Sequence, residues 1–364
     1  MRISELETPA IVIDLDIMER NLQRVAGYAK ENGLRLRPHT KTHKIPALAR
    51  KQMDLGAVGV TVAKVGEAEV MLEASPPDLY VAYPVVGRKK HERLMEVAAR
   101  TRLTVGLDNL QSARQLSDAA REARVRVSVL AEVDVGLGRV GVNPGEELNE
   151  LGRQLTRLPH LDLLGITFYP GHIKSTGEEA DEQVQQLSAA VRDMDASWKR
   201  AGLPLEVVSG GSTPALFQSH LIAGLTEIRP GTYIFNDKNT WFTGACRQED
   251  CAASILTTVV STSRPRQMII DGGSKTFSSD RLVGSSEVSF GYVMEAPTAV
   301  FSKMNEEHGF VDLRSVDGEF SVGDKVRVIP NHICVAMNLH EQVYGIRGDE
   351  VVETWRVAAR GKLQ

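Results

Sequence analysis

Residues 103–133, LTVGLDNLQSARQLSDAAREARVRVSVLAEV, contain the pattern that decides the fold. Two runs rich in β-branched and aliphatic residues, 103–108 and 125–133, flank LQSARQLSDAAREA, in which apolar residues recur at helical spacing. A strand, a helix and a second strand in this order predict two parallel strands joined by a helical crossover.

The same rhythm continues from residue 34 to residue 235. It predicts strands at residues 34–41, 58–64, 79–86, 103–108, 125–133, 161–169, 205–209 and 227–235. Helical segments such as IPALARKQMDLG and RKKHERLMEVAART lie between them. These βα units indicate an α/β fold with a closed (β/α)8 barrel. A doubly wound open sheet is the alternative, but its Gly-rich turn is missing after the first strand.

Two further regions indicate β-structure. The run AIVIDLD, residues 10–16, precedes the barrel units, and short alternating runs separated by Gly, Pro and Asp follow residue 246. A single hydrophobic core stops growing near about 250–300 residues, so a chain of 364 residues suits two domains. We therefore expect a barrel over residues 1–245 and an antiparallel, β-rich, metal-binding domain over residues 246–364. Residues 1–16 could pair with the β-rich domain instead.

The composition argues against several classes of protein. Hydrophobic residues make up 42% and charged residues 25% of the chain, which is typical of a globular protein. A net charge of −4, without clustered Lys and Arg, argues against a nucleic-acid partner. The sequence shows neither a membrane-spanning run nor a signal-peptide pattern. Cys246, Cys251 and Cys334 are too few for a disulfide framework, so we expect reduced thiols in a cytoplasmic protein.

Two Gly-containing segments fall where a barrel of this kind often binds phosphate. SGGST, residues 209–213, follows the seventh predicted strand, and RPGTY, residues 229–233, lies in the eighth unit. Backbone amides and hydroxyl groups in such turns can hold a phosphate, although each turn alone is a common feature. Their joint position predicts a phosphate site made by Ser209, Gly211, Ser212, Thr213, Gly231, Thr232 and Tyr233.

Lys41 ends the first predicted barrel strand, within RPHTKTHK at residues 37–44. In an extended chain, His39, Lys41 and His43 would share one face. A lysine whose amine pKa is lowered by positive neighbours or by burial can form a Schiff base with a carbonyl cofactor. A solvated basic cluster is the alternative, but the barrel and the phosphate segments favour a cofactor site that includes His39 and Lys41.

His332 and Cys334 stand two residues apart in VIPNHICVAMNL, residues 328–339. If this segment is extended, both side chains project from one face and can bind one ion. Imidazole together with thiolate favours Zn²⁺. A buried thiol beside a polar histidine is the alternative for such a pair.

The segments RPHTKTHK, VDVGLGRVGV, FYPGHI, GGSTP, RPGTY and PNHIC together resemble the metal-activated, fold-type III pyridoxal-phosphate enzymes. This family includes D-threonine aldolases and D-serine dehydratases, and the motifs occur in its order over almost the whole chain. The resemblance implies an alanine racemase-like barrel, pyridoxal 5′-phosphate on Lys41, and Zn²⁺ or Mn²⁺ held by His332 and Cys334. It also implies that Arg139 lies beside the cofactor ring and that Tyr169 packs near it.

The same resemblance implies an amino-acid substrate and a homodimer whose site is completed across the interface. The phosphate would be surrounded by Gly211, Ser212, Thr213, Gly231 and Tyr233.

Two reactions of D-3-hydroxy amino acids are compatible with this resemblance. Retro-aldol cleavage gives glycine and an aldehyde, whereas β-elimination gives a 2-oxo acid and ammonia. The sequence departs from the D-threonine aldolases at Cys334, where those enzymes have Asp, and at Ser175, where they have a histidine base. His172 is a candidate replacement for that base.

The segments NLHE and WRVAARG near the end of the chain resemble the aldolases, so we favour the aldolase over the dehydratase. An amino-acid racemase and a non-catalytic pyridoxal-phosphate-binding protein are further alternatives. The racemase leaves His332 and Cys334 unexplained, and the binding protein also leaves the β-rich region unexplained.

Overall fold

The computed structural model describes residues 1–286 and 288–364, which form two compact units. The first, called the barrel unit, comprises Arg24–Lys41, Pro46–Gly231 and Gly361–Gln364. The second, called the sheet unit, comprises Met1–Gln23, Thr42–Ile45 and Thr232–Arg360. Each unit therefore combines segments that are far apart in the sequence.

The barrel unit is built on eight strands in the order β2-β9-β8-β7-β6-β5-β4-β3, and each strand is parallel to its neighbours. Between β5 and β6, for example, Thr104 lies opposite Ser128. His39, which follows β2, forms a parallel bridge with Thr61 of β3, so hydrogen bonds also join the two ends of this order. The predicted (β/α)8 barrel is confirmed. The strands are β2 (Arg35–Leu36), β3 (Val60–Val62), β4 (Asp78–Val81), β5 (Arg102–Leu107), β6 (Val127–Glu132), β7 (Leu161–Thr167), β8 (Val207–Gly210) and β9 (Glu227–Ile228).

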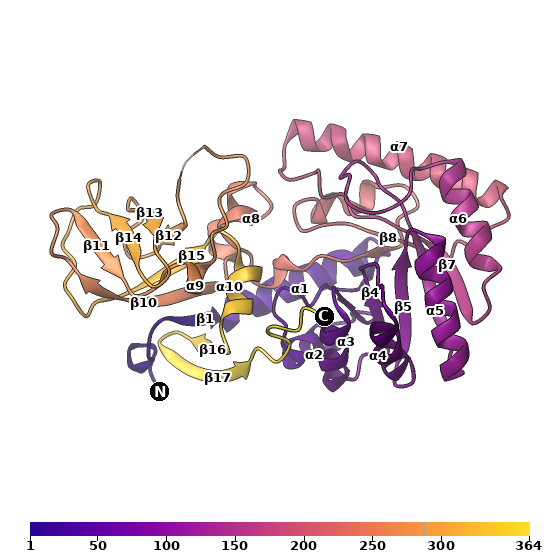
Figure 1. Ribbon diagram of the computed structural model, residues 1–364. Coiled ribbons are helices and arrows are strands. Elements are labelled where there is room, and N and C mark those ends of the chain that lie inside the picture. Colours follow the sequence, from indigo (N-terminus) through magenta and orange to yellow (C-terminus); the bar gives the residue numbers. More distant parts are fainter. Residues whose placement is uncertain (287) are drawn as a thin grey trace. The chain divides into compact units, whose positions relative to one another are not determined.

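Amphipathic helices cover the barrel strands, and Figure 1 shows α5 and α6 alongside β5 and β7. Helix α5 begins where the Asn109 side chain accepts a hydrogen bond from the Ser112 N–H at 2.8 Å, and it ends just before Arg124, whose φ is 55°. Its apolar face buries Ala113 and Leu116. The helices are α2 (Pro46–Asp54), α3 (Val65–Met71), α4 (Arg88–Ala98), α5 (Leu110–Ala123), α6 (Glu146–Thr156) and α7 (Glu178–Arg200), with short 3-10 helices η2 (Leu72–Ala74) and η3 (Leu216–Leu221).

The eighth barrel strand is shorter than residues 227–235, the range expected from the sequence. Strand β9 ends at Ile228, and a 3-10 helix, η4 (Thr232–Ile234), takes the place of its second half. Pro230 lacks an N–H group and therefore cannot continue the hydrogen-bonded ladder. The RPGTY segment is consequently irregular and leads into η4 rather than continuing the strand.

The sheet unit contains a nine-stranded sheet. Strand β10 pairs antiparallel with β1, β11 and β15, and β1 also pairs in parallel with β16. Ile11, Ile255 and Val328 lie in register across three of these strands, and each is 0% exposed. The strands are β1 (Ala10–Asp14), β10 (Ala253–Ser261), β11 (Gln267–Ile270), β12 (Gly291–Val293), β13 (Val300–Met304), β14 (Gly309–Asp312), β15 (Lys325–Pro330), β16 (Gln342–Arg347) and β17 (Glu350–Arg356).

Short helices connect the strands of the sheet unit. They are η1 (Ile3–Glu5), α8 (Lys238–Phe242), η5 (Gln248–Asp250), α9 (Ser274–Phe277) and α10 (Ile333–Leu339), while α1 (Leu15–Glu31) is divided between the two units. No helix among residues 1–286 and 288–364 has the length and apolar character needed to cross a bilayer.

Candidate active site

Lys41 lies in a turn after β2 and not on an extended strand. The Lys41 N–H donates to Nδ1 of His39 at 3.3 Å, and the Ile45 N–H donates to Nδ1 of His43 at 3.0 Å. The prediction that His39, Lys41 and His43 share one face of an extended chain is therefore wrong. Lys41 is exposed, whereas the preceding Thr40 is buried. The turn thus leaves the Lys41 side chain exposed while its backbone is held by a local hydrogen bond.

The loops that carry Arg139, Tyr169 and His172 pack together in the barrel unit. The guanidinium carbon of Arg139 lies 4.9 Å from the centre of the Tyr169 ring, within the range of a cation–π contact. The His172 ring packs against Gly136, where a Cβ atom would lie 3.5 Å from the ring. Nδ1 of His172 is buried and has no hydrogen-bond partner within residues 1–286 and 288–364. Because a buried polar atom without a partner costs free energy, this nitrogen is suited to meet a bound group.

The turn before Arg139 is organised by one carboxylate. Asp134 accepts hydrogen bonds from the N–H groups of Gly136, Leu137 and Gly138 at 3.0, 2.9 and 3.1 Å. Desolvation opposes the ionised form, but these hydrogen bonds prevail and lower the pKa of Asp134. The backbone that carries Arg139 is therefore fixed by interactions within its own loop.

The predicted phosphate segment begins at the end of β8. A Cβ atom on Gly210 would lie 2.5 Å from two carbons of the Phe168 ring, so only glycine fits against this ring. Gly211 has a φ of +89°, a conformation that also favours glycine. Ser212 is buried, and its hydroxyl oxygen accepts from the Ala215 N–H at 3.4 Å. The backbone thus makes a tight turn of the kind that brings amide groups close to a phosphate.

Ser209 differs from the rest of this segment because its hydroxyl is engaged inside the barrel. The hydroxyl donates to Oε1 of Glu227 at 2.6 Å and accepts from the guanidinium of Arg229. Glu227 also accepts from Nε of Arg37 at 2.8 Å, and Arg229 donates to the carbonyl oxygen of Phe168 at 3.0 Å. A hydroxyl group has one proton, and here it points to Glu227, so it leaves none for a phosphate oxygen.

Other buried polar groups near the carboxyl ends of β4, β6 and β7 were not predicted from the sequence. The Tyr80 hydroxyl donates to Oγ1 of Thr167 at 3.0 Å, and Arg229 lies over the Tyr80 ring. Burial raises the pKa of both Tyr80 and Glu132. Oε2 of Glu132 is buried without a partner in the part of the chain that the structure describes. These residues occupy ordinary strand positions, and their polar character alone did not reveal that they cluster.

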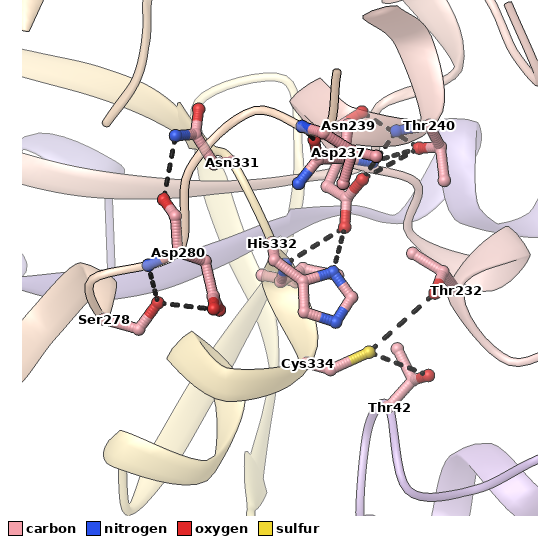
Figure 2. A network of polar contacts seen from close by, with 12 residues as sticks. Thr42, Thr232, Asp237, Asn239, Thr240, Ser278, Asp280, Asn331, His332 and Cys334 are labelled. Atoms are coloured by element: carbon pink, nitrogen blue, oxygen red, sulfur yellow. Dashed lines mark hydrogen bonds and ion pairs between the residues drawn. The ribbon is translucent and has the colours of Figure 1, made fainter. Parts of the chain in front are cut away.

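In the sheet unit, His332 and Cys334 lie at the start of α10. His332 immediately precedes this helix and Cys334 is its second residue, so the segment is not extended, which was the condition for the shared face. The two side chains still face each other, and Figure 2 shows one ring nitrogen of His332 directed towards the Cys334 sulfur. The Cys334 sulfur lies 3.2 Å from Oγ1 of Thr42 and 3.8 Å from Oγ1 of Thr232. Thr232, expected at the phosphate, is thus found beside a predicted metal ligand.

Asp237 contacts the other side of the His332 ring. Its Oδ2 atom lies 3.0 Å from Nδ1 of His332, and the Asp237 side chain is 0% exposed. The negative charge of Cys334, together with hydrogen bonds to Asp237 and Cys334, outweighs burial and raises the pKa of His332 to about 11. These surroundings favour a positive charge at the imidazole, which a proton or a metal ion can supply.

The described residues contain no group of three or more His, Cys, Asp or Glu side chains arranged to hold a metal ion. A metal bound at His332 and Cys334 would therefore take two ligands from this pair. The remaining positions of a four-coordinate ion would be left to water or substrate, as in catalytic rather than structural zinc sites.

Comparison with known proteins gives matches to two domains. Residues 13–239 match the family described as alanine racemase, N-terminal domain, and residues 252–346 match a putative serine dehydratase domain. The first match contains Lys41 and Arg139, and the second contains His332 and Cys334.

Similarity to individual proteins extends over nearly the whole chain. It is 32% identical to the 3-hydroxy-D-aspartate aldolase of Paracoccus denitrificans (strain Pd 1222), over 99% of this chain and 93% of that protein. It is 31% identical to the D-threo-3-hydroxyaspartate dehydratase of Delftia sp. (strain HT23), over 96% of this chain and 97% of that protein. The crystal structure of D-threonine aldolase from Filomicrobium marinum superimposes with a TM-score of 0.94 at 31% identity, covering 100% of this chain and 98% of that chain.

Proposed function

The chain belongs to the alanine racemase N-terminal domain family and carries a serine dehydratase-type domain, and from this we propose a pyridoxal-phosphate- and metal-dependent lyase. Its substrates are D-3-hydroxy amino acids, the class to which the names of its aldolase and dehydratase relatives point. The observation that carries the proposal is the His332–Cys334 pair, which is backed by a buried carboxylate and lies in the dehydratase-type domain.

The residues of the barrel unit fit pyridoxal phosphate. Lys41 offers an exposed amine, Gly211 gives the tight backbone turn for the phosphate, and the buried Nδ1 of His172 lacks a partner within the described residues. Arg139 and Tyr169 would contact the cofactor ring, with Lys41 as its covalent anchor. When bound, the cofactor supplies an electron sink for bond cleavage next to the substrate amino group.

The remaining predicted residues would hold the phosphate or the substrate. Ser212, Thr213, Gly231 and Tyr233 would surround the phosphate with Gly211, and the backbone of Ser209 would contribute without its hydroxyl. His39 would help to place Lys41, because its ring accepts the Lys41 N–H.

The residues of the sheet unit fit a divalent cation. His332 and Cys334 supply one nitrogen and one sulfur ligand, a donor set that favours Zn²⁺ over harder cations such as Mn²⁺. When bound, the metal acts as a Lewis acid that lowers the pKa of a coordinated hydroxyl group. Two protein ligands leave room for both the hydroxyl and the carboxylate of a 3-hydroxy amino acid.

Retro-aldol cleavage is the reaction that we propose, with glycine and an aldehyde as products. Two of the three relatives above are named aldolases. His172 is the proposed base for the substrate hydroxyl, because its Nδ1 atom is buried and has no hydrogen-bond partner among the described residues. The alternative is β-elimination to a 2-oxo acid and ammonia, which is supported by Cys334 and by the dehydratase relative.

The proposal extends to the assembly and the location of the enzyme. The family resemblance supports small-molecule amino-acid substrates and a homodimer with a site completed by the second copy. The lack of clustered Lys and Arg argues against a nucleic-acid partner, and three cysteines, too few for a disulfide framework, favour a cytoplasmic location. Light scattering of the purified protein tests the dimer, because a monomer at micromolar concentration would contradict it.

Product analysis tests the reaction. Purified protein loaded with pyridoxal phosphate is incubated with D-threonine, D-serine or D-3-hydroxyaspartate, in the presence of Zn²⁺, Mn²⁺ or a chelator. Glycine with an aldehyde supports the aldolase, whereas a 2-oxo acid with ammonia replaces it by the dehydratase. Turnover of none of these substrates with either metal overturns the proposal.

A pair of histidine variants tests the base. His172→Gln should abolish cleavage while the metal content stays unchanged. His220→Gln is the matched control, because His220 is exposed and its ring bonds to Tyr28. Full activity of His172→Gln would remove His172 from the mechanism.

A further inference from the structure

We propose that Asp237 is the positioning residue of the metal site and that it fixes the ring of His332 for coordination. This inference rests on the proposed function, because it assigns a role towards the metal held by His332 and Cys334. Asp237 lies 95 positions before His332 in the sequence, and it belongs to neither conspicuous motif around the site, RPGTY or PNHIC.

Both carboxylate oxygens of Asp237 are fully engaged, as Figure 2 shows. Oδ1 accepts from the backbone N–H of Thr240 at 2.9 Å and from its hydroxyl at 3.0 Å. Oδ2 accepts from the backbone N–H of Ile333 at 3.1 Å and lies 3.0 Å from Nδ1 of His332. With 0% exposure, this carboxylate cannot exchange these partners for water without local rearrangement.

The contact with His332 determines which ring nitrogen is available. An ionised carboxylate only accepts hydrogen bonds, so Nδ1 of His332 must carry the proton in this pair. A metal ion that replaced the second ring proton would then bind at Nε2, and this is the nitrogen directed towards the Cys334 sulfur. A carboxylate behind a ligating histidine raises the basicity of the ligand and fixes the ring orientation.

Asp237 also fixes the backbone on which the ligands stand. Asp237 is the N-cap residue of α8, and its contact with Ile333 satisfies the first N–H group of α10. The side chain of Asn331 donates to the carbonyl oxygens of Asp280 and Ser289 and holds the residue just before His332. One carboxylate therefore sets both the ring of His332 and the helix start that carries Cys334.

The main competing role for Asp237 is that of a helix cap with no effect on the metal. Three variants separate the two roles. Asp237→Asn keeps the shape but removes the charge. Asp237→Ser keeps a good N-cap for α8 but is too short to reach His332. Thr240→Val is the control, because it removes the hydroxyl that bonds to Asp237 and leaves the contact with His332 in place.

The experiment is a Zn²⁺ titration of each full-length variant loaded with pyridoxal phosphate, with competition by a chromophoric chelator. Loss of an outer carboxylate typically weakens metal binding about 10- to 100-fold. We expect this increase in Kd for Asp237→Asn and Asp237→Ser, and less than about a threefold change for Thr240→Val. Substitution with Co²⁺ adds a spectroscopic measurement: the thiolate-to-cobalt band should persist in both Asp237 variants, while the ligand-field bands shift.

The metal affinities of the wild type and the variants distinguish a wrong metal site from a wrong role for Asp237. If the wild-type protein binds no Zn²⁺, or if His332→Ala and Cys334→Ala bind it as well as the wild type, the metal site itself is wrong. If the wild type binds Zn²⁺ and the Asp237 variants match its Kd and its Co²⁺ spectrum, Asp237 is only a cap. An equal loss in Thr240→Val also overturns the positioning role. If Asp237→Asn does not fold, Asp237→Ser decides between the two roles.

Discussion

Substitution of Gly210 by alanine should weaken the binding of pyridoxal phosphate. The added Cβ atom would lie 2.5 Å from two carbons of the Phe168 ring, about 1 Å closer than the 3.5–4.0 Å that carbon atoms prefer. Phe168 is 0% exposed, so its ring cannot turn out into solvent to relieve the clash. The loop that begins at Gly210 must move instead, and overpacking of this kind costs about 1–3 kcal/mol.

The expected change in the Kd for pyridoxal phosphate depends on which part of the chain moves to relieve this strain. If the loop moves away from the phosphate, the strain appears in binding, and about 1.4 kcal/mol corresponds to a tenfold change in Kd. Gly210→Ala should therefore raise the Kd for pyridoxal phosphate about 5- to 150-fold. Titration of the apoprotein with the cofactor, followed by tryptophan fluorescence and visible absorbance, measures this constant.

Gly27→Ala provides the matched control for this prediction. Gly27 lies inside α1, and a Cβ atom added there would meet no atom within 4 Å beyond the backbone of its own helix. Alanine should therefore stabilise the helix by about 0.5–1 kcal/mol and leave cofactor binding unchanged. The reasoning is refuted if Gly210→Ala binds the cofactor within twofold of the wild type. It is also refuted if Gly27→Ala weakens binding as much as Gly210→Ala does.

Two further predictions concern Lys41 and Glu132. After gel filtration, Lys41→Ala should lose the visible absorbance of covalently bound pyridoxal phosphate, whereas the exposed control Lys30→Ala should keep it. Absorbance retained by Lys41→Ala would place the covalent link at another residue. Burial raises the pKa of Glu132 above its ordinary 4.5, although the charge of Arg229 opposes this shift. The contribution of Glu132 to the free energy of unfolding is therefore fully present below pH 4.5, and it is lost as the pH rises through the raised pKa. Urea unfolding across this pH range should show a smaller loss of stability for Glu132→Gln than for the wild type, whereas the exposed control Glu122→Gln should behave like the wild type. The same pH dependence of stability in the wild type and both variants would contradict the assignment.

The barrel could be predicted because its signal is local. Strand β5, helix α5 and strand β6 each show their own periodicity within residues 103–133, and burial of one helix face or of a whole strand produces that periodicity. The ends of the elements depend on interactions that local periodicity does not show. Residues 227–235 include β-type residues such as Ile228 and Tyr233, but Pro230 interrupts the ladder and the chain continues into η4.

Sequence motifs select candidate site residues but do not give the local geometry around them. In both RPHTKTHK and PNHIC, alternate side chains would share a face if the segment were extended. In the structure, ring nitrogens of His39 and His43 accept backbone N–H groups two residues later, which bends the first segment into turns. In the second segment, His332 caps the start of a helix. Side chains that bond to their own backbone compete with the strand, and spacing alone does not include that competition.

Asp237 shows why the rest of the site could not be predicted from spacing. Its sequence context, DKNT, indicates only the start of a short helix, since an Asp followed three residues later by Thr is a common cap. Its contact with His332 depends on a pairing of segments that are far apart in the chain. Motifs therefore identify the atoms that would meet a metal, whereas the carboxylate that orients them becomes visible only after the chain has folded. For this reason a variant that changes Asp237 and leaves His332 and Cys334 intact tests the folded site rather than the motif.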